Sequence, residues 1–495
     1  MSSFVGLTDL PDDQRLLDHV HPRDWSNPRP SGRYNLVVIG GGTAGLVSAM
    51  GTAGLGGKVA LIERHLLGGD CLNFGCVPSK ALLSAAHATH ASGVAPSPDD
   101  FTAAMQRLRE IRADIAVHDS AARLRDAGID VFLGDARFTG PDTIEVGGQR
   151  LRFARAVIAT GARAAVPPIP GLDAVRVLTN ETVFALIERP SRLAIVGGGP
   201  IGSELAQAFS RFGTAVRLFD LAPRLLGKDD PDAAAIVARR LQDERVVLTL
   251  GARLLRCEPG PGGSGVLIFD QGAGEERHDF DAILMATGRR PNVEGLGLEA
   301  AGVAFDKHGV TVDRRLRTSN RRIYAAGDCC SKYQFTHAAD AMARIVIQNA
   351  LFCGRKSVAR LVIPWATYTD PEVAHVGLGF DEIAARGAAL TAITVPMSGV
   401  DRAVCEGDGD GFARFHVDRK GRIAAATIVG AHAGDLVGEV SLAMTHGLSM
   451  GHIASTIHPY PTRSEVIKRA ADQFNRTRLT PFVARLLRRV LRWRR

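Results

Sequence analysis

The sequence predicts an α/β protein built on two similar βαβ units. The first unit is "YNLVVIGGGTAGLVSAMGTAGLGGKVALIE", where an apolar strand runs into Gly40-x-Gly42-x-x-Gly45, a small-residue helix follows, and a second strand ends at Glu63. The glycines permit a tight turn and a close backbone approach to a pyrophosphate at a helix N-terminus. An acid about 20 residues later can hold a ribose hydroxyl. This arrangement predicts a dinucleotide site.

The same pattern recurs in "RLAIVGGGPIGSELAQAFSRFGTAVRLFD", with glycines at 197, 199 and 202. Asp220 follows Gly197 by 23 residues, and Glu63 follows Gly40 by the same interval. Each unit is followed by a matched segment, "AVIATGARA" and "AILMATGRRPN". A duplication of this length predicts two dinucleotide sites in one chain.

Between the two units lies "DCLNFGCVPSK", which places Cys71 and Cys76 five positions apart in a chain with seven cysteines. The N-terminus has no basic start followed by an apolar stretch, so we expect a cytoplasmic protein, where structural disulfides are rare. A zinc site needs about four converging ligands, and no second pair stands at zinc-like spacing. No metal site is therefore predicted, and redox chemistry is the favoured interpretation.

Three further segments complete a recognisable pattern: "IYAAGD" at residues 323–328, "FTHAADAMA" and "TDPEVAHVG". With the two glycine motifs and the cysteine pair, residues 34 to 472 resemble the pyridine nucleotide-disulfide oxidoreductases. The resemblance implies two Rossmann-like dinucleotide-binding domains, for FAD and NAD(P), and a C-terminal α+β dimerisation domain. We therefore expect a homodimer and the following division: an N-terminal arm at 1–33, a discontinuous FAD-binding domain at 34–185 and 290–360, an NAD(P)-binding domain at 186–289, a dimerisation domain at 361–472 and a basic tail at 473–495.

The resemblance also assigns cofactor residues. Those implied for FAD are Gly40, Gly42, Gly45, Glu63, Gly69, Asp70, Lys80, Thr160, Gly161, Asp328, Thr336 and His337. Those implied for NAD(P) are Gly197, Gly199, Gly202, Glu204, Asp220 and Gly288. Asp220 favours NADH, because a carboxylate repels a 2′-phosphate. Arg217 and Arg224 lie close in sequence and keep NADPH as the alternative.

By the same resemblance, a hydride passes from NAD(P)H to the flavin, and the electron pair then reduces a Cys71–Cys76 disulfide. Cys76 is the flavin-proximal sulfur and Cys71 meets the acceptor, while Lys80 pairs with Glu204 beside the flavin. "VPSKALLSAAHATH" predicts a helix with Pro78 in its first turn. That placement puts Cys76 near a positive helix end and Lys80 nearby, and both favour a thiolate.

The acceptor is indicated by "TIHPYPTRSE", residues 456–465. Disulfide-reducing members carry a proton-shuttling histidine where this chain has Tyr460, and Glu465 matches the glutamate that orients it. Tyrosine has an ordinary pKa near 10, which suits proton transfer at neutral pH poorly. In an extended segment, His458 would share a side with Tyr460 and could serve as the acid/base; a structural role is the alternative.

Tyrosine at this position resembles mercuric reductase, so that branch is the leading prediction for function, with a small-molecule, thiol or disulfide acceptor. The chain lacks that enzyme's C-terminal cysteine pair, since no cysteine follows Cys405. Dihydrolipoamide dehydrogenase is the enzymatic alternative. Cys329 and Cys330 are interpreted as small core residues.

The two ends carry separate signals. The tail holds eight arginines and no acid, and the other 52 Lys and Arg balance the 52 Asp and Glu. Leu479, Val483, Leu486, Val490 and Trp493 recur at helical spacing, with Arg485, Arg488, Arg489 and Arg492 interleaved. Such a helix can lie on an anionic membrane at its inner surface, or dock on its own dimer. A membrane-surface flavoprotein with an interaction role is thus an alternative of another class; nucleic acid is not expected as a partner.

Residues 1–33 predict an irregular arm that Trp25 could pin to the FAD domain.

Overall fold

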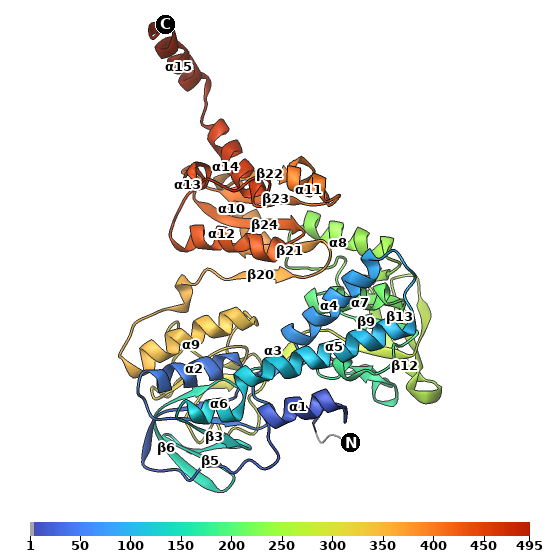
Figure 1. Ribbon diagram of the computed structural model, residues 1–495, viewed down its shortest axis with the longest axis vertical. Coiled ribbons are helices and arrows are strands. Elements are labelled where there is room, and N and C mark those ends of the chain that lie inside the picture. The colour runs from blue at the N-terminus through green and yellow to red at the C-terminus, as the bar shows by residue number, and fades with distance from the viewer. Residues whose placement is uncertain (1–3) are drawn as a thin grey trace. The chain divides into compact units, whose positions relative to one another are not determined.

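The computed structural model describes residues 4–495, which divide into two compact units (Figure 1). The first unit comprises Met1–Gly197, Ala208–Phe219 and Ala252–Leu361, and the second comprises Gly198–Gln207, Asp220–Gly251 and Val362–Arg495. This division cuts through the predicted NAD(P) domain, so the five-part division of the sequence remains a prediction. The α/β class is confirmed.

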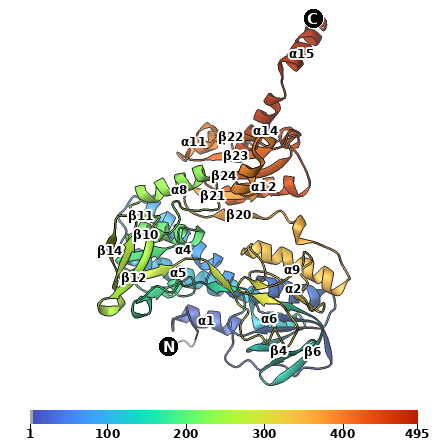
Figure 2. The same ribbon diagram turned by 180° about the vertical axis from the view of Figure 1, so that it is seen from behind.

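The first unit contains a seven-stranded sheet in the order β3-β2-β1-β6-β5-β4, with β19 paired to β6. Strands β1, β2, β3, β6 and β19 run parallel, and β4 and β5 form an antiparallel extension. Their bounds are β1 Arg33–Ile39, β2 Val59–Glu63, β3 Ile129–Leu133, β4 Ala136–Gly140, β5 Thr143–Val146, β6 Gln149–Ile158 and β19 Ile323–Ala325. Helices α2 (Thr43–Gly54) and α9 (Thr336–Leu351) lie side by side against the parallel strands, as both views show (Figures 1 and 2).

A second parallel arrangement, β10–β9–β15–β8, carries the second glycine motif. Phe219, Leu267, Phe269 and Phe280 form part of the apolar core beside it. The bounds are β8 Val177–Leu178, β9 Arg192–Val196, β10 Ala215–Asp220, β11 Val247–Leu250 and β15 Ala282–Met285. Antiparallel pieces complete the first unit: β7 Ala162–Ala164 with β16 Arg289–Pro291, β17 Phe305–Asp306 with β18 Gly309–Val310, and β12 Arg253–Pro259, β13 Gly265–Asp270 and β14 Glu275–Phe280.

The second unit contains a five-stranded antiparallel sheet in the order β20-β21-β24-β23-β22. Its strands are β20 Pro364–Thr367, β21 Glu372–Gly377, β22 Thr391–Pro396, β23 Phe412–Val417 and β24 Ile423–Gly430. Alternate residues such as Ala413, Phe415 and Val417 point to one face, where they form a core with Val440 and Ile467 from the helices. Period-two burial on a sheet covered by helices is the α+β arrangement that was predicted.

The remaining helices connect these sheets. Those of the first unit are α1 Pro11–Val20, α3 Gly69–Asn73, α4 Cys76–Ala91, α5 Pro98–Ala116 and α6 Ala121–Asp126. Helix α7, Pro200–Arg211, follows the second glycine motif. Those of the second unit are α8 Pro231–Asp243, α10 Phe380–Arg386, α11 Asp401–Cys405, α12 Ala433–Thr445, α13 Met450–Ser455, α14 Glu465–Thr477 and α15 Pro481–Trp493. Within residues 4–495, no helix is both long enough and apolar enough to cross a bilayer.

The N-terminal arm is more regular than predicted, because it contains α1. Pro11 occupies the first turn of that helix, where its missing N–H costs nothing, and Leu16, Leu17 and Val20 are buried. Trp25 does pin the arm: its indole Nε1 donates to the Val131 carbonyl at 3.1 Å. The apolar spacing at residues 16, 17 and 20 indicates a helix, but the prolines on both sides of this stretch favoured an irregular segment in the sequence analysis.

The turn between β1 and α2 generates a stability prediction. Gly40 has φ +107°, and a Cβ there would lie 2.3 Å from the Ala159 carbonyl oxygen. We expect Gly40→Ala to lower the free energy of unfolding by about 2 kcal/mol or more, because both the backbone and the neighbouring strand must move. Gly54→Ala is the matched control, since a Cβ at Gly54 meets nothing within 4 Å and alanine favours the helix. Urea unfolding of both variants measures this, and equal stability of the two would contradict it.

Candidate active site

The two glycine turns share one geometry. Gly40 and Gly197 have φ values of +107° and +110°, and a Cβ on either would lie 2.3 Å from a carbonyl oxygen, that of Ala159 or of Ala286. The Gly40 N–H donates to the Ile62 carbonyl, and the Gly197 N–H donates to the Phe219 carbonyl, both at 2.8 Å. Each accepting residue is the last but one of the strand that follows the glycine helix. Only glycine fits such a turn, so the duplication predicted from spacing is confirmed as a repeated structure.

The acids at the strand ends are also held alike. Glu63 accepts hydrogen bonds from the Gly41 and His65 N–H groups at 2.5 and 2.7 Å. Asp220 accepts from the Gly198 and Ala222 N–H groups at the same distances. Burial raises the pKa of Glu63, and these N–H groups oppose that rise. Each carboxylate therefore lies beside its glycine turn, where a ribose hydroxyl can reach it.

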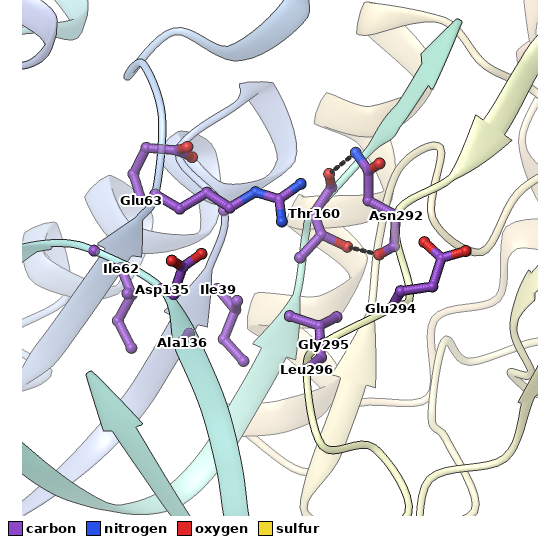
Figure 3. A pocket seen from close by; sticks show the side chains of 13 residues that line it. Ile39, Ile62, Glu63, Asp135, Ala136, Thr160, Asn292, Glu294, Gly295 and Leu296 are labelled. Carbon is purple, nitrogen blue, oxygen red and sulfur yellow. Dashed lines mark hydrogen bonds between the residues drawn. The ribbon is translucent and has the colours of Figure 1, made fainter. Parts of the chain in front are cut away.

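A cavity of about 210 Å³ opens beside the first turn (Figure 3). Glu63 lies at one side, and Thr160 lies opposite, hydrogen-bonded to Asn292 in both directions at 2.7 and 2.9 Å. The cavity is lined by Ile39, Gly40, Ile62, Glu63, Arg64, Gly134, Asp135, Ala136, Thr160, Asn292, Glu294, Gly295 and Leu296. The lining combines apolar residues such as Ile39, Ile62 and Leu296 with polar ones, and Glu63 beside the turn can accept a hydrogen bond from a ribose hydroxyl, so the cavity can take a nucleoside.

Other predicted FAD residues surround the same turn. Gly42 precedes α2, and a Cβ on Gly69 would lie 2.5 Å from the Gly42 Cα, so the cysteine segment starts against the glycine turn. Gly45 packs on Gly40, and Gly161 has φ +66°. Close backbone contact therefore brings Gly69, and with it the following cysteines, next to the first dinucleotide turn.

Cys71 lies in α3 and Cys76 is the first residue of α4, and both are present as free thiols. The Cys71 thiol donates a hydrogen bond to Cys76, and this bond is the largest effect lowering the pKa of Cys76 to about 6. Partial desolvation opposes it, while the Thr336 hydroxyl, 3.4 Å from Cys76 Sγ, and the charge of Lys80 reinforce it. The pKa of Cys71 is raised, because its proton is held in the same bond. The pair thus has one thiolate and one thiol at neutral pH.

A charged cluster not predicted from the sequence lies next to the cysteines. Arg289 donates to Asp70 at 2.9 Å and lies 3.5 Å from Asp328, and Asn180 donates to Asp70 at 2.9 Å. Burial raises the pKa of Asp328 to about 6, and Arg289 opposes that rise. Arg289 follows Gly288 in the quoted "ATGRRPN" segment. Its partner Asp70 lies more than 200 positions before it in the chain, and its partner Asp328 lies close to 40 positions after it. Nothing local in the sequence indicates this cluster.

The NAD(P) residues surround the second turn. Gly199 is open on its Cβ side, Gly288 has φ +108°, and Gly202 lies in α7. Glu204, buried on the same helix, accepts a hydrogen bond from the Tyr368 N–H at 2.8 Å. The predicted pairing of Glu204 with Lys80 joins the two units and remains a prediction.

The predicted acceptor-side residues take separate partners. Tyr460 is 71% exposed and its hydroxyl donates to Asp401 at 2.7 Å, which raises the pKa of the tyrosine further. The His458 side chain is only 7% exposed and bonds Glu439 at 2.8 Å and the Thr456 carbonyl at 3.1 Å. The segment is not a strand, and the predicted placement of both side chains on one side remains a prediction. Glu465 Oε1 binds Arg469 at 2.9 Å, whereas its buried Oε2 has no hydrogen-bond partner among the described residues.

Cys329 is fully buried in the core of the first unit, and Cys330 packs beside it. Their sulfurs donate to main-chain carbonyls of Ile158, Ala326 and Gly327. Across residues 4–495, histidines, cysteines and acids nowhere gather in the groups of three that a metal ion requires. The interpretation of this pair as core residues is consistent with its surroundings.

Comparison with known proteins identifies the family. The profile of the pyridine nucleotide-disulphide oxidoreductases matches residues 34–343, and that of their dimerisation domain matches residues 363–471. The chain belongs to the pyridine nucleotide-disulphide oxidoreductase family. It is an FAD-dependent, NAD(P)H-using oxidoreductase with a C-terminal dimerisation domain. The resemblance stated from the motifs is confirmed.

Several members of this family are similar over most of the chain. Mercuric reductase of Lysinibacillus sphaericus is 33% identical, covering 90% of this chain and 83% of the relative. Dihydrolipoyl dehydrogenase of Thermus scotoductus is also 33% identical, covering 90% and 98%. The solved structure of the HOCl-induced flavoprotein disulfide reductase RclA of Escherichia coli superimposes with a TM-score of 0.81 at 30% identity, covering 89% and 99%.

The contact between Thr336 and Cys76 predicts a measurable change in thiol reactivity. We expect Thr336→Val to raise the pKa of Cys76 from about 6 by about 0.7 pH units, because one hydrogen bond to the thiolate contributes about 1 kcal/mol. Alkylation of Cys76 by iodoacetamide as a function of pH, read by peptide mass spectrometry, measures it. Thr336→Ser keeps the hydroxyl and should retain the wild-type profile; an unchanged profile in both variants would contradict the contact's role.

Proposed function

We propose that the enzyme passes an electron pair from NADH to a Cys71–Cys76 disulfide and on to a soft metal ion, in the manner of mercuric reductase. The observation that carries this proposal is the unequal setting of the two sulfurs: Cys76 is the first residue of α4 and its Sγ lies 3.4 Å from the Thr336 hydroxyl, and the pKa of Cys76 is lowered while that of Cys71 is raised. A reducible pair needs one sulfur that is stable as a thiolate and one that meets the acceptor. Helix α4, the Thr336 hydroxyl and Lys80 select Cys76 as the stable thiolate.

The first glycine turn suits FAD. When bound, FAD supplies the two-electron carrier between the nicotinamide and the disulfide. The cavity beside Glu63 would take the adenosine, the Gly40–Gly42 turn the pyrophosphate, and Asp328 the ribityl chain. A Cβ at Gly40 or Gly45 would collide with the carbonyl oxygen of Ala159 or Gly40, so glycine at both positions permits the tight turn that leads into the N-terminus of α2, where backbone N–H groups can bind phosphate.

The second turn suits NADH. Asp220 lies beside the second glycine turn, where it would accept a hydrogen bond from a ribose 2′-hydroxyl, and the two nearby arginines are engaged elsewhere. The Arg217 guanidinium stacks over Phe219 and Phe269, at 5.3 and 4.7 Å from the ring centres. Arg224 donates to the carbonyls of Leu226, Gly227 and Asp229. Neither arrangement leaves a guanidinium directed at a 2′-phosphate.

A coenzyme prediction follows. We expect kcat/KM to be at least about tenfold higher for NADH than for NADPH, because a carboxylate disfavours the 2′-phosphate. Steady-state kinetics with both coenzymes and one acceptor give the ratio. Asp220→Ser should reduce the ratio of kcat/KM values, mainly by increasing kcat/KM for NADPH. An NADPH preference in the unmodified enzyme would contradict the assignment of NADH as the coenzyme.

The groups available for proton transfer favour a metal ion as the acceptor. Cys71 holds its proton, and reducing an organic disulfide requires a group that removes and returns that proton. Tyr460 has a raised pKa and donates to Asp401, and both ring nitrogens of His458 are bonded within the chain. A soft metal ion displaces a thiol proton on binding, so it does not need such a group. The similarity to mercuric reductases agrees with this choice.

Dihydrolipoyl dehydrogenase activity is the second candidate, favoured by the NADH assignment and by a relative with that activity. We expect the unmodified enzyme to oxidise NADH with a Hg(II) thiolate and to turn over oxidised lipoamide slowly. Tyr460→His should increase lipoamide turnover about tenfold or more by supplying a base near neutral pH. Tyr460→Phe is the control. Fast lipoamide turnover by the unmodified enzyme would overturn the metal-ion proposal in favour of the second candidate.

We also propose that α15 holds the enzyme on the inner surface of an anionic membrane. None of its residues is buried. The helix separates two faces: an apolar face of Phe482, Val483, Leu486, Leu487, Val490, Leu491 and Trp493, and a basic face of Arg485, Arg488, Arg489 and Arg492. Phe482 is 68% exposed and Trp493 is 87% exposed. A wide apolar face opposite an all-arginine face matches the boundary between acyl chains and anionic headgroups.

Sedimentation with lipid vesicles tests this surface. We expect the full chain to bind phosphatidylglycerol vesicles, to bind phosphatidylcholine vesicles weakly, and to dissociate as salt rises. Leu486→Ser with Trp493→Ser should weaken binding at least about tenfold, because it removes apolar burial while keeping the charge. Arg476→Gln, in α14, is the control. Equal binding by the double variant, or a change in dimer mass instead, would contradict a membrane role.

A further inference from the structure

The N-terminal arm contains a buried carboxylate that the redox chemistry described above does not use. The Asp13 side chain, on α1, has no exposed surface. Its Oδ2 accepts hydrogen bonds from the Thr8 N–H and hydroxyl, both at 2.7 Å. Its Oδ1 forms an ion pair with Arg112, whose side chain is also fully buried, and Arg109 lies 3.8 Å from Oδ2. A buried carboxylate with this many partners is fixed in place.

Arg112 connects this carboxylate to the cysteine segment. It lies on α5 and donates from Nη1 to the main-chain carbonyl of Asn73 at 2.8 Å. Asn73 stands between Cys71 and Cys76, and its own side chain donates to the carbonyls of Leu67 and Gly69 at 3.0 and 2.8 Å. The chain of contacts from Asp13 through Arg112 to Asn73 therefore ends in the middle of the span that sets the separation of the sulfurs.

Further contacts of the arm reach the two sides of the same span. The Leu67 N–H donates to the Val20 carbonyl at 3.2 Å, just before the cysteine segment. A Cβ on Gly6 would lie 2.8 Å from the Phe74 ring and 1.9 Å from the Glu181 carbonyl oxygen, so the arm passes tightly over Phe74. The Phe74 ring also contacts His65, whose ring contacts Phe4. The family profile begins at residue 34, so the arm lies outside the matched region.

We propose that the N-terminal arm is a positioning element for the redox pair, in which Asp13 and Arg112 hold the Asn73 carbonyl and thereby keep Cys71 and Cys76 in contact. The inference rests on the proposed role of these two cysteines. Fixing the span raises the effective concentration of one thiol at the other, which favours the closed disulfide and maintains the hydrogen bond that stabilises the Cys76 thiolate. Asp13 acts through Arg112, and it touches neither cysteine nor any predicted cofactor residue.

The equilibrium between the dithiol and the disulfide tests this role. The FAD-loaded full chain is equilibrated in glutathione buffers of varied ratio, quenched with iodoacetamide and digested with trypsin. Cleavage after Arg64 and Lys80 gives one peptide, residues 65–80, that contains both cysteines and reports their state by mass. We expect Asp13→Asn to lower the equilibrium constant for disulfide formation about fivefold and to raise the pKa at which Cys76 becomes reactive.

Arg15→Gln is the matched control. Arg15 also joins α1 to α5, through Asp114 at 2.7 Å, but this pair is exposed and has no contact with Asn73. The control should keep the wild-type equilibrium constant within about twofold. An Asp13→Asn protein that is folded by circular dichroism but keeps the wild-type constant would overturn the proposal, as would an equal change in both variants.

Thr8→Val decides the matter if Asp13→Asn does not fold. This change removes one hydrogen bond to Asp13 and keeps the ion pair, so a smaller decrease, about twofold, is expected. A folded Thr8→Val protein with an unchanged constant overturns the positioning role. The failure of the underlying function is distinguishable: in that case the wild-type peptide forms no disulfide in oxidised glutathione at all.

Discussion

In the proposed function, everything depends on the hydrogen bond between the thiols of Cys71 and Cys76. It divides one proton unequally, so Cys76 becomes a thiolate near pH 6 while Cys71 keeps its proton. The structure builds this inequality from several directions. Cys76 begins α4, Thr336 begins α9 and faces it, Lys80 adds a positive charge one turn on, and close contact between Gly69 and Gly42 sets where the segment starts. None of these alone makes a redox pair, but together they assign different roles to two chemically identical side chains.

The duplicated turns show how one backbone solution serves two cofactors. In both, a glycine at positive φ lies against a carbonyl of the neighbouring strand, and an acid 23 residues later accepts from the adjacent N–H. The turns differ in what surrounds them. A cavity with a mixed apolar and polar lining accompanies the first, whereas the arginines near the second are held by aromatic rings and by main-chain carbonyls. In the proposed assignment, the backbone supplies phosphate affinity and the side chains decide which dinucleotide is accepted.

The sequence predicted these turns well because their determinants are local: glycine spacing, a following helix and an acid at a strand end all lie within 30 residues. It also predicted that α4 opens near Cys76. The sequence did not indicate the Asp70–Arg289–Asp328 cluster, since its members meet only after the sheet assembles. The helix α1 was missed because prolines outweighed a short apolar pattern. In each failure, tertiary contacts overrode the local pattern.

The proposed function requires that electrons from NADH reach Cys71 and Cys76. The direct measurement is anaerobic: the oxidised, FAD-loaded enzyme is mixed with NADH, quenched with iodoacetamide, and the peptide of residues 65–80 is weighed against a sample without NADH. With NADH, we expect the disulfide to be reduced so that iodoacetamide adds one alkyl group to each of the two cysteines, while peptides holding Cys329 and Cys330 are unchanged. If NADH reduces the flavin but the 65–80 peptide gains no alkyl group, the electrons do not pass through Cys71 and Cys76, and the proposed function is contradicted.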